Sequence, residues 1–162
     1  MGILVEQGRE KLEHMNVEDY AGHVYLEEGI LRFSSMAEKW ELEVANIEAI
    51  IEYTTEEGPY MCDYFLVMID RNCYEYRLPT EAKCFSEVLQ RLEVRLGFKL
   101  RMSLTFSTNF RSRVLFPEDL FGQEGYVLKK MPRNLIRSFF CFRDNAELVL
   151  AKPVTDLCHS KI

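Results

Sequence analysis

Histidine is scarce in this sequence, and the motifs of the commonest enzyme chemistries are missing. The three histidines, His14, His23 and His159, share no metal-ligand spacing with a cysteine or with each other. The patterns G-x-x-x-x-G-K-[ST], G-x-G-x-x-G and G-x-S-x-G do not occur. We therefore predict a protein that is not an enzyme and that binds no metal and no cofactor, with His23 as a partly buried packing residue.

Long hydrophobic runs are also missing. The longest uncharged apolar stretch covers residues 64–69, far short of the about 20 residues that cross a bilayer. The N-terminal residues lack the basic region of a signal peptide, Glu6 breaks the myristoylation pattern, and Cys158 lies too early for prenylation. These absences predict a soluble, cytoplasmic protein.

Paired cysteines are a further absence. The five cysteines are odd in number and widely spaced, without a C-x-x-C motif; they are Cys62, Cys73, Cys84, Cys141 and Cys158. This pattern argues against a disulfide framework and against a zinc ribbon. We expect each cysteine to act as a small buried hydrophobe in a reducing compartment.

What the sequence does contain is the composition of one globular domain. The chain has 162 residues, of which 48% are hydrophobic and 28% charged, so it can bury a substantial core. Without a linker or repeat, we predict a single domain over 1–162, with an N-terminal helical segment (1–18), a core (20–97) and a C-terminal β extension (98–162).

Two hydrophobic periodicities predict an α+β fold. Residues 40–44 alternate strictly, which places Trp40, Leu42 and Val44 inward and the intervening glutamates in water. Similar strands are predicted at 23–27, 30–33, 48–54, 63–70 and 74–78, in one antiparallel meander. Beyond Pro79 the period changes to that of an amphipathic helix over 80–96, with Thr80 as its cap and Phe85, Leu89 and Leu92 facing the sheet.

The C-terminal third predicts further strands. Residues 101–107 alternate, and an apolar strand ends near Pro117, which cannot donate to a ladder. A hairpin is expected from residues 136–142 and 147–151, with Asp144 and Asn145 in its turn.

The order of these elements resembles a known family. The stretches HVYLEEGILRFSS (23–35) and WELEVANIEAI (40–50), followed by a meander and one long helix, resemble the bacterial pleckstrin-homology-like and GRAM-like domains. The resemblance implies a partly open barrel over about residues 20–97. Glu27 and Glu28 stand where the phosphoinositide-binding members carry cations, so the resemblance favours a protein-binding scaffold over a lipid-binding one.

The net charge of −6 is unevenly distributed and suggests the kind of partner. Residues 1–100 hold 20 acidic against 10 basic residues, whereas 101–162 hold 6 against 10. We expect a non-enzymatic module that binds a basic protein, in the manner of an immunity-type protein that neutralises a basic toxin. The alternatives are a membrane-surface adaptor and, through the arginines and phenylalanines of the C-terminal third, a single-stranded nucleic-acid binder.

The predicted partner site is acidic and contains one aromatic anchor. Glu41 and Glu43 share the outer side of one strand, and the loop after Thr54 adds further acids beside an exposed turn. The candidate residues are Glu41, Glu43, Glu56, Glu57, Tyr60 and Asp63. Charges at such a site set the association rate, and a tyrosine that the partner buries sets the residence time of the complex.

Overall fold

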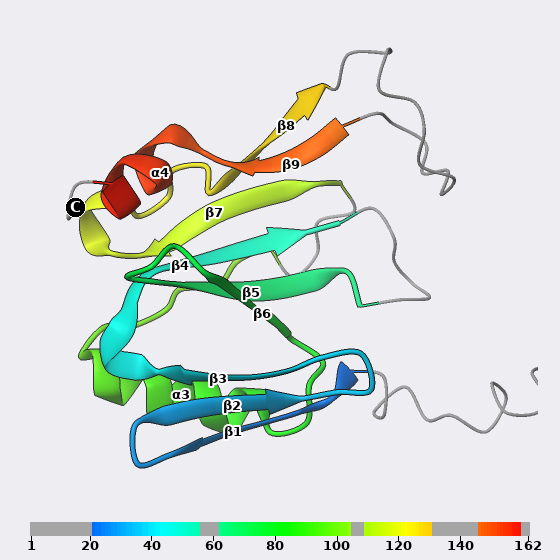
Figure 1. Cartoon of the computed structure of the whole chain (residues 1–162), viewed down its shortest axis with the longest axis vertical. Helices are drawn as coiled ribbons and strands as arrows, with labels where there is room; N and C mark the ends of the chain where they lie inside the picture. Colours follow the sequence, from blue (N-terminus) through cyan, green and yellow to red (C-terminus); the bar gives the residue numbers. More distant parts are fainter. Residues whose placement is uncertain (1–20, 56–61, 105–108, 131–145, 160–162) are drawn as a thin grey trace, which may run out of the picture.

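Antiparallel sheets and helices make up the described part of the chain, which confirms the α+β meander. The computed structural model describes residues 21–55, 62–104, 109–130 and 146–159. The strand orders are β1-β2-β3, β6-β5-β4-β7 and β8-β9 (Figure 1). The elements are β1 (His23–Glu27), β2 (Ile30–Ser34), β3 (Lys39–Glu43), η1 (Val44–Asn46), β4 (Ile47–Thr54), β5 (Tyr64–Asp70), β6 (Glu75–Pro79), α3 (Phe85–Leu96), β7 (Arg111–Phe116), η2 (Glu118–Leu120), β8 (Tyr126–Lys130), β9 (Ala146–Leu150) and α4 (Lys152–His159).

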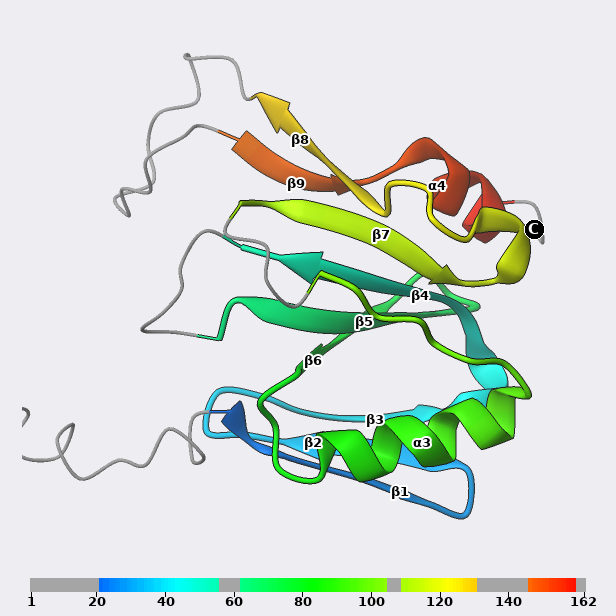
Figure 2. The same ribbon diagram turned by 180° about the vertical axis from the view of Figure 1, so that it is seen from behind.

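The first sheet, β1-β2-β3, is amphipathic. A two-residue turn joins β1 to β2, and its residues Glu28 and Gly29 both have positive φ values, 49° and 84°, as a tight hairpin of this length requires. Side chains alternate between a buried and an exposed side, as the periodicity predicts. Helix α3 covers the buried side of this sheet (Figures 1 and 2).

The first six predicted strands do not form a single sheet. The chain leaves β3 through η1, where Val44 is buried, and starts a second sheet at β4. Trp40 bridges the edges of the two sheets: its indole N–H donates to the Arg77 carbonyl at 3.1 Å, and its ring meets Tyr76 edge-on. A side chain thus replaces a backbone ladder at this seam, and the sheets stay open.

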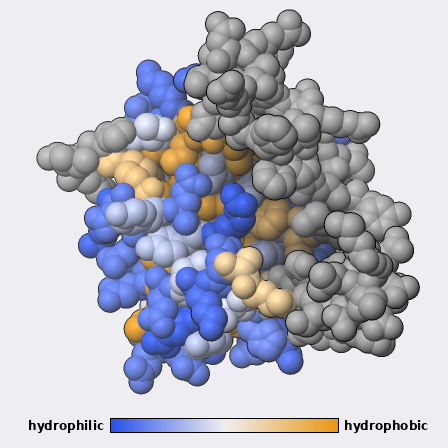
Figure 3. All heavy atoms as spheres, turned by 45° about the vertical axis from the view of Figure 1, so that its right-hand side comes forward, coloured by the Kyte–Doolittle hydropathy of each residue, from blue (hydrophilic) through white to orange (hydrophobic). Residues whose placement is uncertain are grey.

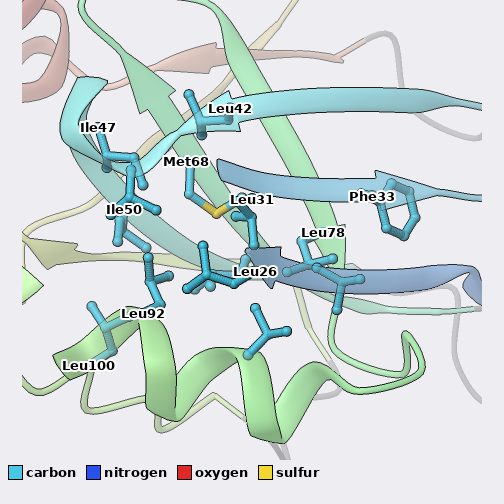
Figure 4. Close-up of a cluster of buried hydrophobic side chains, with 14 of the residues drawn as sticks. Leu26, Leu31, Phe33, Leu42, Ile47, Ile50, Met68, Leu78, Leu92 and Leu100 are labelled. Carbon is cyan, nitrogen blue, oxygen red and sulfur yellow. The ribbon is translucent and has the colours of Figure 1, made fainter. Parts of the chain in front are cut away.

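The main core lies between the first sheet, the second sheet and α3. Leu26 and Leu31 from the first sheet, Ile50 from the second and Leu92 from the helix point toward one another (Figure 4). All four are at most 2% exposed. The apolar stripe of α3 therefore packs where its spacing predicts.

Helix α3 begins later than expected. Its first residue is Phe85, and Cys84 precedes it in a left-handed conformation without a side-chain cap. The Thr80 N–H instead donates to the Tyr64 carbonyl at 3.0 Å, which keeps Thr80 beside β5. Gly97 ends the helix in a left-handed conformation, as expected.

The strand expected at 101–107 is wrong over its described part. Residues 101–104 form no ladder, because the N–H groups of Ser103 and Leu104 donate to the Glu52 carboxylate, at 3.1 and 3.4 Å. A buried side chain thereby takes the place of a neighbouring strand. Residues 105–108 lie outside the described ranges.

The C-terminal strand β9 has a partner that the sequence did not predict. It pairs with β8, with Tyr126 opposite Leu150, while the expected partner residues 136–142 lie outside the described ranges. Residues 131–145, which include the expected turn, and the N-terminal helical segment 1–18 lie outside the described ranges. Neither β8 nor α4 was expected, and the two pack on the second sheet in a separate apolar cluster that contains Ile51, Val67 and Val154.

Tyr126 links this C-terminal unit to β6 and makes stability depend on pH. The buried hydroxyl donates to Glu75 Oε2 at 2.6 Å. Burial, and then the bond to Glu75, raise the pKa of Tyr126 well above its usual value. The native state therefore keeps a proton that the unfolded state loses near pH 10, so this contribution to stability is complete below about pH 10 and is lost progressively above it.

We expect Tyr126→Phe to flatten the alkaline loss of stability. In the wild type, the native state keeps one proton that the unfolded state releases. This difference lowers the free energy of unfolding by up to about 1.4 kcal/mol per pH unit above pH 10. Urea unfolding at intervals from pH 8 to 11.5 measures the slope. Tyr25→Phe, at an exposed hydroxyl, is the matched control and should keep the wild-type slope. Equal slopes in the wild type and Tyr126→Phe would contradict the assignment.

Candidate functional site

The exposed side of the first sheet is the candidate binding surface, here called the outer face. Alternation along β1, β2 and β3 sends one residue in two to this side. Its residues are His23, Tyr25, Glu27, Ile30, Arg32, Ser34, Lys39, Glu41 and Glu43. The described residues of α3 and of the second sheet that pack on the first sheet meet its buried side chains, and Figure 2 shows α3 over that side.

Tyr25, Arg32 and Glu41 form the middle row of the outer face. The strand register places them opposite one another. The Arg32 guanidinium lies 6.0 Å from the centre of the Tyr25 ring, and its Nε donates to Glu41 Oε1 at 2.9 Å. Tyr25 is 44% exposed, so its ring is held in position while remaining accessible.

Carboxylates gather toward the end of the outer face that carries the β1–β2 turn. Glu27 lies opposite Ile30, which lies opposite Glu43. Arg32 reaches Glu27 Oε2 only at 3.9 Å, and exposed ion pairs of this kind contribute about 0–1 kcal/mol. Figure 3 shows another side of the molecule, on which the described residues are mainly hydrophilic in the lower part, while hydrophobic ones lie in the upper part.

The structure brings together two of the six predicted site residues. Glu41 and Glu43 lie on the outer face as predicted, and both are exposed. Asp63 lies next to β5 in the second sheet, where its carbonyl accepts the Thr55 N–H at 2.7 Å. The other three, Glu56, Glu57 and Tyr60, lie outside the described residues.

Tyr25 is the site residue that the sequence interpretation missed. Its signal was present, because the alternation along His23–Glu27 places it on the same side as Glu27. The same alternation exposes His23, so its prediction as a partly buried packing residue is wrong.

A groove adjoins the outer face at the β1–β2 turn. It runs between this turn and the last turns of α3, and it consists of two hollows of about 380 and 510 Å³. Glu28, Gly29 and Arg95 line both hollows. Glu43 belongs to the larger hollow and to the outer face, which makes the two surfaces continuous.

The cysteines are free wherever the structure describes them, but they differ in burial. Cys158 is buried as expected, whereas Cys84 is exposed, and Cys62 and Cys73 are half-buried; Cys141 lies outside the described residues. Burial, and then a hydrogen bond to Glu81, raise the pKa of Cys62 to about 11. Burial, and then Cys73, raise the pKa of Cys158 to about 12. Both thiols stay protonated near neutral pH and are poor nucleophiles.

The basic C-terminal third is the other predicted binding surface, for single-stranded nucleic acid, and only part of it is described. Arg113 is committed to an internal ion pair with Glu52, and the aromatic-rich stretch from 131 to 143 lies outside the described ranges.

Within the described ranges no three potential ligands gather that could hold a metal ion, and no helix there is long and apolar enough to cross a bilayer. Comparison with protein families, with curated proteins and with solved structures finds no match to this chain.

Proposed function

We propose that this protein is a non-enzymatic binding module that recognises a basic protein through the outer face. The observation that carries the proposal is an exposed tyrosine, Tyr25, on a sheet face that also carries Glu27, Glu41 and Glu43 and that no described element covers. Neutralisation of a basic toxin by an immunity-type protein is one function that such a face would serve.

The chemistry of the outer face supports a protein partner. Carboxylates attract a basic partner and speed its association, while an aromatic side chain that becomes buried slows dissociation. The ring of Tyr25 is already positioned by Arg32, which lowers the entropy lost when the partner covers it. The same carboxylates repel anionic lipid headgroups and nucleic-acid phosphates.

The test uses a photo-crosslinking amino acid in place of Tyr25. A tyrosine in the turn segment directly before β6, Tyr74, is 66% exposed and is the matched control position. After crosslinking in the native host, we expect a basic protein to be captured from position 25 and not from position 74. Capture of an acidic protein, equal capture from both positions, or no capture would contradict the proposal.

Kinetics with the purified partner then test the two roles separately. Reversing Glu27, Glu41 and Glu43 together to lysine should slow association at low salt by about tenfold or more, because electrostatic steering raises on-rates by such factors. Tyr25→Ala should mainly speed dissociation. Unchanged association after the triple reversal would contradict a role for the outer face.

A further inference from the structure

The groove beside the outer face is built around one arginine and one glycine. The Arg95 guanidinium lies directly over the β1–β2 turn, because a Cβ atom on Gly29 would stand 2.8 Å from Arg95 Nη1. Gly29 therefore serves two purposes: it adopts the positive φ of the turn, and it leaves room for the guanidinium. Figure 2 shows this end of α3 beside the turn.

Arg95 is available to a ligand. Among the described residues, no carboxylate lies within ion-pair distance of its guanidinium. Its neighbour one helical turn earlier, Arg91, reaches Glu87 only at 3.9 Å, with half of its side chain exposed. Both arginines line the smaller hollow, together with the amide side chain of Gln90. The two guanidinium groups are hydrogen-bond donors suited to a carboxylate, and Glu28 is the one acidic residue in the lining of this hollow.

The larger hollow shares Glu28 and Arg95 with the smaller one and differs from it by the carboxylate of Glu43. Glu43 and Glu28 supply carboxylates there, and Ile30, Ile47 and Leu96 supply apolar walls. Glu43 accepts one hydrogen bond from the Asn46 side chain at 3.2 Å, which positions the carboxylate and leaves its other oxygen for a ligand. A long basic side chain matches this lining, because its methylene stem can lie on apolar walls while its charged end meets a carboxylate.

We infer that the groove binds a segment of the partner in which an acidic and a basic side chain project side by side. The acidic side chain enters the smaller hollow, at Arg91 and Arg95, and the basic one enters the larger hollow, at Glu43. This inference rests on the proposed function and gives it specificity. The outer face attracts any cationic surface, whereas the groove selects a partner with an acidic residue at the right place.

Two single-residue probes test the two hollows without the partner. N-acetyl-arginine amide and N-acetyl-glutamate α-amide are titrated separately into the isotope-labelled full chain, and backbone amide shifts are recorded. We expect arginine to give saturable shifts at Ala45 and Ile47, and glutamate to give them at Gln90 and Val94. The uncharged isosteres, N-acetyl-citrulline amide and N-acetyl-glutamine amide, should shift neither set.

Two substitutions that each remove one charge serve as matched controls for each other. Glu43→Gln should weaken arginine binding about fivefold, the factor for an exposed ion pair of about 1 kcal/mol, and leave glutamate binding unchanged. Arg91→Gln should do the reverse. Both side chains are exposed, so the dispersion of the spectra should show native folding.

The outcomes separate this inference from the proposed function. Shifts that do not saturate, that appear equally with the uncharged isosteres, or that survive both substitutions would overturn the groove as a site. If crosslinking and kinetics support the outer face while the probes fail, the proposed function stands and the groove inference is wrong. If the probes behave as expected and no basic partner is captured at Tyr25, the groove binds such side chains but the proposed function is wrong.

Discussion

Replacing Arg113 by leucine is expected to lower the free energy of unfolding by about 3–5 kcal/mol, the usual cost of removing one partner from a buried ion pair. Its partner Glu52 is 0% exposed, and Arg113 Nη2 lies 2.7 Å from Glu52 Oε1. Without the guanidinium, a negative charge stays buried in the second sheet. Urea unfolding followed by circular dichroism measures the loss.

A second substitution and a matched control test this reason. Adding Glu52→Leu to Arg113→Leu should recover part of the lost stability, because the unpaired charge is gone. The recovery is incomplete, since the Tyr64 hydroxyl also donates to this carboxylate. Arg111→Leu, at an exposed arginine on the same strand, should change stability by less than about 0.5 kcal/mol. Equal effects at positions 111 and 113 would contradict the argument.

Leu92→Ala is expected to lower the free energy of unfolding by about 2–5 kcal/mol, as large-to-small changes in a packed core do. Leu92 is 1% exposed and lies at the centre of the helix stripe, facing Leu26 and Ile50 (Figure 4). The cavity that the alanine leaves would open between the helix and both sheets, which cannot all close around it.

Alanine substitutions at two other positions on α3 should lower the free energy of unfolding by less than Leu92→Ala does. Leu89→Ala should cost less than Leu92→Ala, because Leu89 is only partly buried. Val94→Ala removes a side chain that is 82% exposed and should have almost no effect. The same denaturant titration ranks the three variants. A different ranking would mean that the helix docks through another face.

Local periodicity predicted the first six strands and the helix because each carries its own pattern. Within β1-β2-β3 and between β5 and β6, consecutive strands pair through short turns, so the register there follows from the alternation and the turn length. The division into two sheets was not visible, because η1 interrupts the chain for only three residues and the seam is closed by Trp40. Nothing in the local pattern identifies a partner 37 residues away.

The errors in the C-terminal third have a different cause. β9 has an apolar pattern that fits several partners, and only tertiary packing decides that β8 is the one. Residues 101–104 have the alternation of a strand, yet the buried carboxylate of Glu52 captures their N–H groups. A single buried acid inside an otherwise apolar strand is the signal that could have predicted such a capture.

Part of the candidate site was predicted because side chains alternate between the two sides of a strand. Alternation along β3 was sufficient to place Glu41 and Glu43 on one exposed side. It was also sufficient to place Tyr25 on that side, whereas the sequence interpretation assigned the aromatic anchor to Tyr60 in a loop. The groove could not be predicted, because it depends on the docking of α3 beside a turn that lies about 65 residues earlier in the chain, between Gly29 and Arg95.

Trp40 is the single tryptophan of the sequence and lies at the seam between the two sheets. Its emission therefore reports on one place, where the edge of β3 meets Arg77 and Tyr76. Separation of the sheets exposes the indole to water and removes its hydrogen-bond acceptor, which shifts the emission to the red. Trp40 fluorescence therefore measures whether the first and second sheets are in contact, and it does so independently of the secondary structure within each sheet.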